Sequence, residues 1–270
     1  MRQINLLNVT IHNITMAELL ESIRGGGVVL TPNVDHIMKL QNNVEFYGVY
    51  QEADYRVCDS KILMYVSNFL GTPIQEKISG SDLFPAFYNH FQNDQNIKIF
   101  LLGADQQTVK TAQQKINHKV GRDIVVAAHS PSFGFEQDEV ECQKIVELIN
   151  ASKATVLAVG VGAPKQELWI AKYKSQLVHV KIFLAIGATI NFEAGDVQRS
   201  PRWMSEIGLE WLFRLASEPR RLWKRYILSV APFFWLVLQQ KLSLYENPWS
   251  TIKPTNETKI LPKFNRINLE

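Results

Sequence analysis

The sequence contains too few cysteines for a disulfide framework or a zinc site. Among its 270 residues only Cys58 and Cys142 are cysteines, and neither belongs to a CxxC pair or a Cys/His cluster. We interpret both as small buried hydrophobic side chains in a reducing compartment. The first twenty residues also lack a signal peptide's continuous apolar block and small-residue cleavage site. We therefore expect a cytoplasmic protein.

Long apolar runs are absent as well. No stretch reaches the 18 consecutive apolar residues of a membrane-spanning helix. The best candidate, residues 226–238, is interrupted by Ser229 and Pro232. This segment is too short to span a bilayer, although it could lie on one.

Common nucleotide and metal signatures are missing too. There is no GxGxxG fingerprint, no P-loop GK[ST] and no DxD pair, and the six histidines are scattered. An NAD-dependent oxidoreductase is disfavoured, because the third glycine and the downstream ribose-binding acid are not apparent. We predict that the protein uses no cofactor and holds no metal ion.

The residues that are present indicate a globular protein with one basic region. The chain is 46% hydrophobic, which suffices to bury a sizeable core. Its net charge of +3 is unevenly placed, since seven basic and only three acidic residues lie between Arg199 and Arg225. Such a segment suggests a polyanionic partner, which could be nucleic acid, anionic lipid or a diphosphate.

From residue 28 onward, short apolar runs alternate with amphipathic stretches. The runs cover residues 28–31, 55–58, 97–102, 124–128, 155–161 and 182–186, and helices are expected near 33–47, 60–70, 81–91, 105–118, 136–150 and 164–175. This alternation predicts an α/β fold with a mostly parallel sheet and helices on both faces. In such sheets the ligand binds beyond the carboxyl ends of the strands.

Polar residues follow two of the early runs. Thr31 and Asn33 end the first run, either as turn formers or as groups that bind a sugar or phosphate. Asp59 follows the second run, where an aspartate serves either as the N-cap of the next helix or as a general base. Lys77 precedes a Gly-Ser-Asp helix entry and could meet a diphosphate as a point charge.

A glycine-containing turn precedes the helix expected near 164–175. In VGVGAPKQELWI, residues 159–170, Gly162 could let backbone N–H groups approach a phosphate, or could simply form a tight turn. Lys165, Gln166 and Glu167 then place three polar groups where one helix cap would suffice.

The alternation of short apolar runs with amphipathic stretches ends near residue 195. Residues 202–218 carry a polar stripe opposite an apolar face, typical of a helix docked on a core. Pro219 opens a segment with basic residues on one side and aromatic and aliphatic residues on the other, as in a helix lying among lipid headgroups. No nucleic-acid partner is expected, because a recognition fold or stacking platform is not apparent. We expect a core of residues 1–195, a helical appendage of residues 196–247 and a polar, flexible tail of residues 248–270.

Together these residues resemble the WecG/TagA/CpsF family of bacterial glycosyltransferases, glycosyltransferase family 26. The resemblance covers residues from about 27 to 226. It is carried by TPN at 31–33, the spacing of Ala53, Asp54 and Asp59, SGSDL at 79–83, VGVGAPKQE at 159–167, IGATINFEAGDVQRSP at 186–201 and GLEWLFRLASEPRRLWKRY at 208–226.

The resemblance implies a Rossmann-like core and an appendage that touches the membrane and helps to complete the active site. Family members typically transfer N-acetylmannosamine or its uronic acid from a UDP-sugar to an undecaprenyl-diphosphate-linked sugar, in surface polysaccharide synthesis. By matching position, the base falls on Asp59 and substrate contacts on Thr31 and Gln166. The appendage arginines fall on Arg214, Arg220, Arg221 and Arg225. We expect an inverting, metal-independent hexosyltransferase on the inner face of the plasma membrane.

Three positions depart from the family pattern. Ser60 replaces a glycine, Lys77 an arginine and Asn191 an aspartate. The donor or acceptor could therefore differ from that of the best-known members. The alternatives are another nucleotide hexose used for capsule or exopolysaccharide assembly, and a non-catalytic lipid-binding subunit of such a pathway. Whether the protein forms a homo-oligomer stays open.

Overall fold

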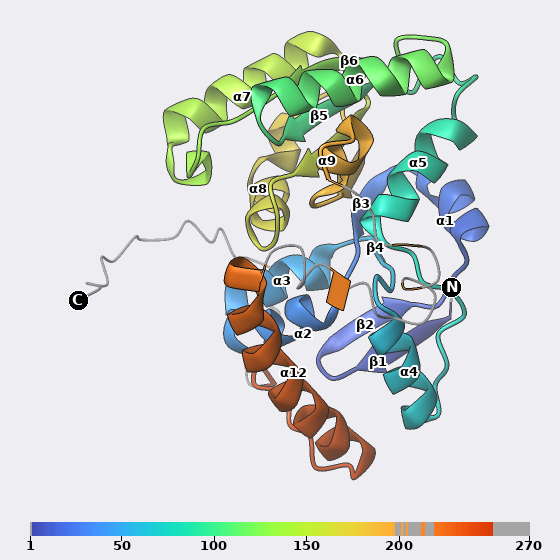
Figure 1. Cartoon of the computed structure of the whole chain (residues 1–270), viewed down its shortest axis with the longest axis vertical. Helices are drawn as coiled ribbons and strands as arrows, with labels where there is room; N and C mark the ends of the chain where they lie inside the picture. Colours follow the sequence, from blue (N-terminus) through green and yellow to red (C-terminus); the bar gives the residue numbers. More distant parts are fainter. Residues whose placement is uncertain (1, 198–200, 202–203, 205–211, 214–218, 251–270) are drawn as a thin grey trace.

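The computed structural model describes residues 2–197, 201, 204, 212–213 and 219–250, and for residues 219–229 it describes the backbone alone (Figure 1). Within these residues the chain forms an α/β fold with a six-stranded sheet and a separate two-stranded hairpin. Most of the helix expected at residues 202–218 and most of the tail expected at 248–270 lie outside the described residues.

Every pairing in the six-stranded sheet is parallel. The strand order is β4-β3-β8-β7-β5-β6. The strands are β3 (Gly27–Leu30), β4 (Tyr55–Arg56), β5 (Ile99–Gly103), β6 (Val125–His129), β7 (Val156–Gly160) and β8 (Ile182–Ala185). All six apolar runs are thus confirmed as strands, with their ends shifted by a few residues.

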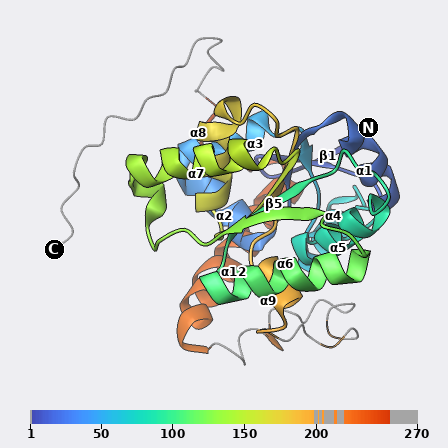
Figure 2. The same cartoon turned by 90° about the horizontal axis from the view of Figure 1, so that it is seen from above.

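Both faces of the sheet are buried. Because successive strand residues point to opposite faces, Leu157 and Val159 of β7 belong to one hydrophobic cluster, whereas Val156 and Ala158 belong to another. Figure 2 shows α3, α7 and α8 on one side of the sheet and α6 and α9 on the other. This two-sided coverage explains why the four inner strands, β3, β8, β7 and β5, are apolar throughout instead of alternating with polar residues.

The helices divide between the two clusters. Side chains of the first cluster come from α2 (Val34–Asn42), α3 (Val44–Glu52), α4 (Lys61–Leu70), α7 (Glu139–Ser152), α8 (Lys165–Tyr173) and α12 (Pro219–Lys241). Those of the second come from α1 (Met16–Ser22), α5 (Gly80–His90), α6 (Gln106–Val120) and α9 (Thr189–Ala194). Short 3-10 helices cover Ile23–Gly25, Phe135–Gln137 and Lys174–Gln176.

Several elements differ from the sequence-based expectation. The hairpin of β1 (Gln3–Leu6) and β2 (Val9–His12), with α1 and α9, was not predicted. The helix expected at 33–47 is two helices, because Asn43 adopts an extended conformation and its side chain caps α3 by accepting from the Phe46 N–H at 2.8 Å.

Helix α12 begins at Pro219, as predicted, and packs against α2 and α4. Its Phe233 and Val237 are buried in the first cluster. Gln240 accepts from the Leu7 N–H at 2.8 Å and donates to the Asn5 carbonyl at 3.0 Å, which joins α12 to the N-terminal hairpin. No helix among the described residues combines the length and apolar character needed to cross a bilayer.

Candidate active site

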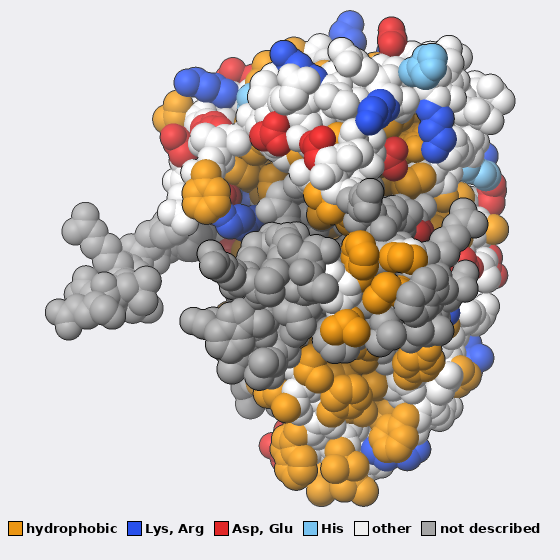
Figure 3. Space-filling model, viewed as in Figure 1, with side chains coloured by type: hydrophobic (Ala, Val, Ile, Leu, Met, Phe, Trp, Pro, Cys, Tyr) orange, Lys and Arg blue, Asp and Glu red, His pale blue; other side chains and the backbone are white. Residues whose placement is uncertain are grey.

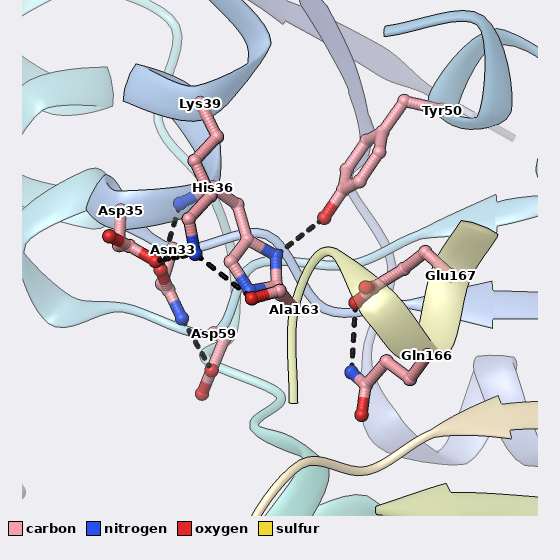
Figure 4. A network of polar contacts seen from close by, with 9 residues as sticks. All are labelled: Asn33, Asp35, His36, Lys39, Tyr50, Asp59, Ala163, Gln166 and Glu167. Carbon is pink, nitrogen blue, oxygen red and sulfur yellow. Dashed lines mark hydrogen bonds and ion pairs between the residues drawn. The ribbon is translucent and has the colours of Figure 1, made fainter. Parts of the chain in front are cut away.

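The polar residues predicted from the sequence gather beyond the carboxyl ends of β3, β4, β7 and β8. Because β3 lies between β4 and β8, and β8 lies beside β7, the loops that follow these strands adjoin. A Cβ atom at Gly160 would lie 2.7 Å from the carbonyl oxygen of Gly187, so a glycine is needed where β7 and β8 end. Figure 4 shows the side chains that meet in this region.

Asp59 lies at this edge beside Asn33. The Asn33 side-chain nitrogen approaches Oδ2 of Asp59 at 3.5 Å, and the Asp59 N–H donates to the Pro32 carbonyl at 3.0 Å. The helix after Asp59 is capped by Ser60, whose side chain accepts from the Ile62 N–H at 3.2 Å. Asp59 is therefore not the N-cap of α4.

Asn33 also has a structural role, as a helix cap, and Thr31 is buried close to it in the sequence. Asn33 is the N-cap of α2, and its Oδ1 accepts from the His36 N–H at 3.2 Å. Its amide nitrogen is left to face Asp59, so one side chain both begins a helix and contacts the candidate base. Thr31 is buried directly after β3, two residues before Asn33.

Gln166 ties two loops of the site together. Its Oε1 accepts from the Gly162 N–H at 3.3 Å and from the Gly187 N–H at 3.1 Å. Its Nε2 donates to Oε1 of Glu167 at 2.8 Å. Gly162 has a φ of +85°, a conformation that suits glycine. The loops after β7 and β8 are thus held together by one buried amide.

Glu167 is a buried carboxyl group. It is 1% exposed, and its Oε2 has no hydrogen-bond partner among the residues that the structure describes. Burial raises the pKa of Glu167 to about 7, while the hydrogen bond from Gln166 and the charge of Lys39 oppose the rise. Near neutral pH this group is therefore divided between its protonated and ionised forms.

Lys39 links α2 to the turn that precedes α8. Its Nζ donates to the Ala163 carbonyl at 3.0 Å and pairs with Oδ2 of Asp35 at 2.8 Å. Beneath this pair, His36 Nδ1 and the Tyr50 hydroxyl lie 2.6 Å apart in a buried contact. Burial raises the pKa of Tyr50, and the nearby carboxylates, first among them Glu167, add to the effect.

Lys77 lies close to Asp59 because their neighbours in the chain, Ile78 and Cys58, are joined by a backbone hydrogen bond. The Ile78 N–H donates to the Cys58 carbonyl at 2.7 Å, so the segment before α5 runs beside the end of β4. Burial raises the pKa of the Cys58 thiol to about 12, and the charges of both Asp59 and Lys77 act on that thiol. The Lys77 ammonium pairs with Oδ2 of Asp82 at 3.2 Å.

Two other predicted residues are placed less centrally. Lys165 pairs with Glu136 at 2.5 Å and lies over the Phe133 ring, at 5.0 Å from its centroid. Asn191 lies in α9, where its backbone carbonyl accepts from the Gly195 and Asp196 N–H groups at 3.1 Å.

The side chains of the four appendage arginines lie outside what the structure describes. Arg214 lies outside the described residues. Arg220, Arg221 and Arg225 belong to the part of α12 of which only the backbone is described. Within the residues that the structure covers, no group of three or more His, Cys, Asp or Glu side chains could hold a metal ion.

The sequence-based search did not identify Lys39, Asp35, His36 or Tyr50 as part of this site. Their sequence signal was weak, because they lie on helical stretches that also fit an ordinary amphipathic pattern. The position of α2 and α3 directly after β3 was the one available indication, since residues there lie near the carboxyl edge of the sheet.

Comparison with known proteins identifies the family. Three relatives carry the name N-acetylglucosaminyldiphosphoundecaprenol N-acetyl-beta-D-mannosaminyltransferase. The Bacillus spizizenii protein is 28% identical over 217 residues, 80% of each chain. The Bacillus subtilis protein is 27% identical over 226 residues, 83% of this chain and 84% of its own. A Staphylococcus aureus protein is 25% identical over 254 residues, 88% of this chain and 93% of its own.

A family model describes a larger set of such proteins. The model of the glycosyl transferase WecG/TagA/CpsF family matches residues 4–247, which include all but the first residue of the hairpin, the whole six-stranded sheet and α12. The chain therefore belongs to the WecG/TagA/CpsF family of glycosyl transferases.

Proposed function

We propose that this protein transfers N-acetylmannosamine from a UDP donor to N-acetylglucosamine carried on undecaprenyl diphosphate. The names of the three relatives support this acceptor and this transferred sugar. The observation that carries the proposal is the position of Asp59 at the carboxyl edge of a parallel sheet, beside Asn33 and directly before Ser60, which caps the next helix. This edge is where Rossmann-like folds bind nucleotides.

In the proposed reaction, a hydroxyl oxygen of the acceptor sugar forms a bond to the anomeric carbon of the donor. The bond from that carbon to the UDP oxygen breaks, and UDP leaves. Asp59 takes the hydroxyl proton as the new bond forms. Attack from the side opposite the departing diphosphate inverts the anomeric carbon.

Negative charge on the departing diphosphate needs positive partners. Lys77, close to Asp59, is one candidate. Arg214, Arg220, Arg221 and Arg225 supply further positive charge in the sequence. Preorganised cations of this kind can stabilise a leaving group directly, so the proposal includes metal independence.

The other proposed substrate contacts are Thr31, Asn33, Gln166 and the neighbouring Gly162, Lys165, Glu167 and Asn191. For Gln166 the existing hydrogen bonds restrict the role, because its oxygen already accepts from two backbone N–H groups. One hydrogen of its Nε2 is engaged with Glu167, so a substrate contact would use the other hydrogen and would need an acceptor atom on the substrate.

We further propose that residues 196–247 form an appendage that associates with the cytoplasmic membrane surface, where a lipid-linked acceptor is found. The assay that tests the function uses the full chain, a lipid-diphosphate-linked N-acetylglucosamine acceptor and a panel of UDP-sugars. The panel contains UDP-N-acetylmannosamine, its uronic acid and UDP-N-acetylglucosamine, each with and without EDTA.

Mass spectrometry of the lipid product should show one added N-acetylmannosamine, with or without EDTA. Transfer of another hexose alone would replace the donor assignment. Loss of activity with EDTA would overturn metal independence. No transfer and no UDP release from any donor would favour a non-catalytic lipid-binding subunit.

A further inference from the structure

The pairing of β3 with β4 sets Asn33 opposite Asp59. In this parallel pair Leu30 lies opposite Arg56, an offset of 26 residues that Asn33 and Asp59 share. The pairing continues beyond the strands, because the Asp59 N–H donates to the Pro32 carbonyl at 3.0 Å. The contact between the two side chains is therefore a consequence of the sheet register, and both stand at the carboxyl edge of the sheet.

The amide group of Asn33 can face Asp59 in one orientation only. Its Oδ1 accepts from the His36 N–H at 3.2 Å, and only the oxygen of an amide can accept such a bond. The nitrogen is thereby turned toward Oδ2 of Asp59, at 3.5 Å. This distance is long for an N–H···O hydrogen bond, as catalytic contacts often are before the substrate binds. The capping bond thus selects a hydrogen-bond donor for the carboxylate.

A neutral donor suits a carboxylate that must accept a proton. The terminal torsion of an aspartate side chain has broad minima, so an unheld carboxylate can take many orientations. A hydrogen bond from Asn33 restricts this rotation, and Figure 4 shows the amide and the carboxylate facing each other. A cation in the same place would hold the ionised form more strongly and would oppose protonation. An amide therefore orients Asp59 and leaves it able to act as a base.

Two helices begin beside the Asp59 carboxylate. Helix α2 starts directly after Asn33, and α4 starts at Lys61. The other end of α4 adjoins the end of α12, since Lys241 Nζ donates to the Phe69 carbonyl at 2.8 Å, and Figure 3 shows apolar side chains gathered at that end of the molecule. The N-terminal ends of α2 and α4, which carry partial positive charge, thus both lie near the carboxylate. They favour its ionised form, which is the form that can take a proton.

We propose that Asn33 positions the base: its oxygen caps α2, and its nitrogen orients the Asp59 carboxylate. The inference deepens the proposed function, on which it rests for the role of Asp59. It adds to the substrate contact proposed above, because the amide nitrogen carries a second hydrogen. Asn33 then acts on the transfer step, since it holds the carboxylate where the hydroxyl of the acceptor can reach it.

Asn33→Ser separates the two roles of this side chain. Serine caps a helix about as well as asparagine does, but its single oxygen takes the capping position and it has no amide to face Asp59. Asn43→Ser is the matched control. Asn43 is also a half-buried N-cap of a nine-residue helix, and it accepts from the Phe46 N–H at 2.8 Å. Both variants should melt at a temperature close to that of the unmodified protein.

Transfer assays and calorimetry give the first test. Asn33→Ser should lower kcat by about tenfold to a hundredfold, because it leaves the base poorly oriented. The Kd of the UDP-sugar should change by less than about threefold, since a positioning residue acts mainly on the transition state. Asn43→Ser should leave both values unchanged. A normal kcat for Asn33→Ser would overturn the inference, and a normal kcat with a weaker Kd would make Asn33 a substrate contact alone.

A double substitution distinguishes positioning from an independent substrate contact. Asp59→Asn already removes the base, so the addition of Asn33→Ser should cause little further loss of kcat. If the two losses multiply instead, Asn33 acts separately from Asp59 and the inference is wrong.

Nuclear magnetic resonance tests the contact without any activity. The side-chain amide signals of Asn33, identified by their loss in Asn33→Ser, should move when Asp59→Ala removes the carboxylate. Those of Asn43 should stay in place. Unmoved Asn33 signals would overturn the inference. If the protein transfers no sugar from any donor, the proposed function fails, whereas moved Asn33 signals still support its hold on Asp59.

Discussion

Gln166 donates a 2.8 Å hydrogen bond from its side-chain nitrogen to the carboxyl group of its neighbour Glu167, and both side chains are buried. Consecutive residues of a helix point about 100° apart, so the contact depends on a particular orientation of both. The same amide holds the loops after β7 and β8 through its oxygen. Glu167 thereby helps to orient the Gln166 amide, which joins two loops of the candidate site.

Glu167→Gln should change how stability depends on pH. Burial raises the pKa of Glu167 from 4.5 to about 7, so the folded protein binds this proton more tightly than the unfolded chain. The resulting stabilisation is complete below the unfolded value and is lost as pH rises through about 7. The size of the shift corresponds to roughly 3 kcal/mol.

Urea unfolding of both proteins from pH 5 to 8 measures this effect. The free energy of unfolding of the unmodified protein should fall with pH relative to that of Glu167→Gln. A difference that stays constant across the range would show that Glu167 has an ordinary pKa. Glu167→Leu, which cannot accept the Gln166 hydrogen bond, should also raise the KM for the sugar donor.

Lys39→Met should loosen the turn that precedes α8. The substitution removes a hydrogen bond to the Ala163 carbonyl and the ion pair with the largely buried Asp35. We expect a loss of about 1–3 kcal/mol in the free energy of unfolding, together with a higher KM for the donor.

Lys172→Met provides the comparison for Lys39. Lys172 pairs with Glu139 at 2.6 Å, and both side chains are largely exposed. Such surface pairs contribute about 0–1 kcal/mol. Equal destabilisation by the two substitutions, measured by urea unfolding, would mean that the Ala163 contact adds little.

Asp59→Asn should abolish most of the transferase activity. The amide has nearly the same shape as the carboxylate but cannot accept the proton, so kcat should fall by about 10²- to 10⁴-fold. Donor binding, measured by calorimetry, and the melting temperature should change little.

Asp123→Asn is the control for Asp59. Asp123 precedes β6, at the amino-end edge of the sheet, and is exposed. The transferase activity of the Asp123→Asn protein should match that of the unmodified protein. A nearly active Asp59→Asn protein would remove Asp59 from the mechanism.

Phe233→Ala and Phe234→Ala should differ sharply although the residues are adjacent. Phe233 is fully buried, and truncating a buried phenylalanine costs about 3–5 kcal/mol. Phe234 is 49% exposed, and a substitution at such a surface position changes stability by about 0.5 kcal/mol or less. Chemical denaturation of both variants checks this, and equal losses would contradict the packing of α12 on the core.

The parallel sheet was predictable because its four inner strands, β3, β8, β7 and β5, are apolar on both faces and are followed by polar residues or glycines. The hairpin was missed although Ile4 and Leu6 are buried and alternate with exposed Gln3 and Asn5. That alternation is the usual strand signal. The α1 start also had a readable signal, since Thr15 and Glu18 form a capping box.

The gathering of these candidate residues at one edge of the sheet was predictable, but the contacts among them were not. Residues 31–33, 59 and 162–167 follow strands, and the topology brings them to one edge of the sheet. Lys165 was grouped with Gln166 and Glu167 by adjacency, yet it pairs with Glu136 because successive helical residues point in different directions. The Lys39 contact with Ala163 spans 124 residues, and depends on how α2 packs beside α8.

The bonds between Gln240 and the N-terminal hairpin also bear on how the chain is made. Leu7 and Gln240 are 233 residues apart, so the hairpin emerges from the ribosome long before its partner exists. At typical synthesis rates that interval is roughly ten to fifty seconds. The first element of the protein to be translated therefore waits for α12 to complete its contacts. If translation stopped within α12, the hairpin at the opposite terminus would lack its hydrogen bonds to Gln240.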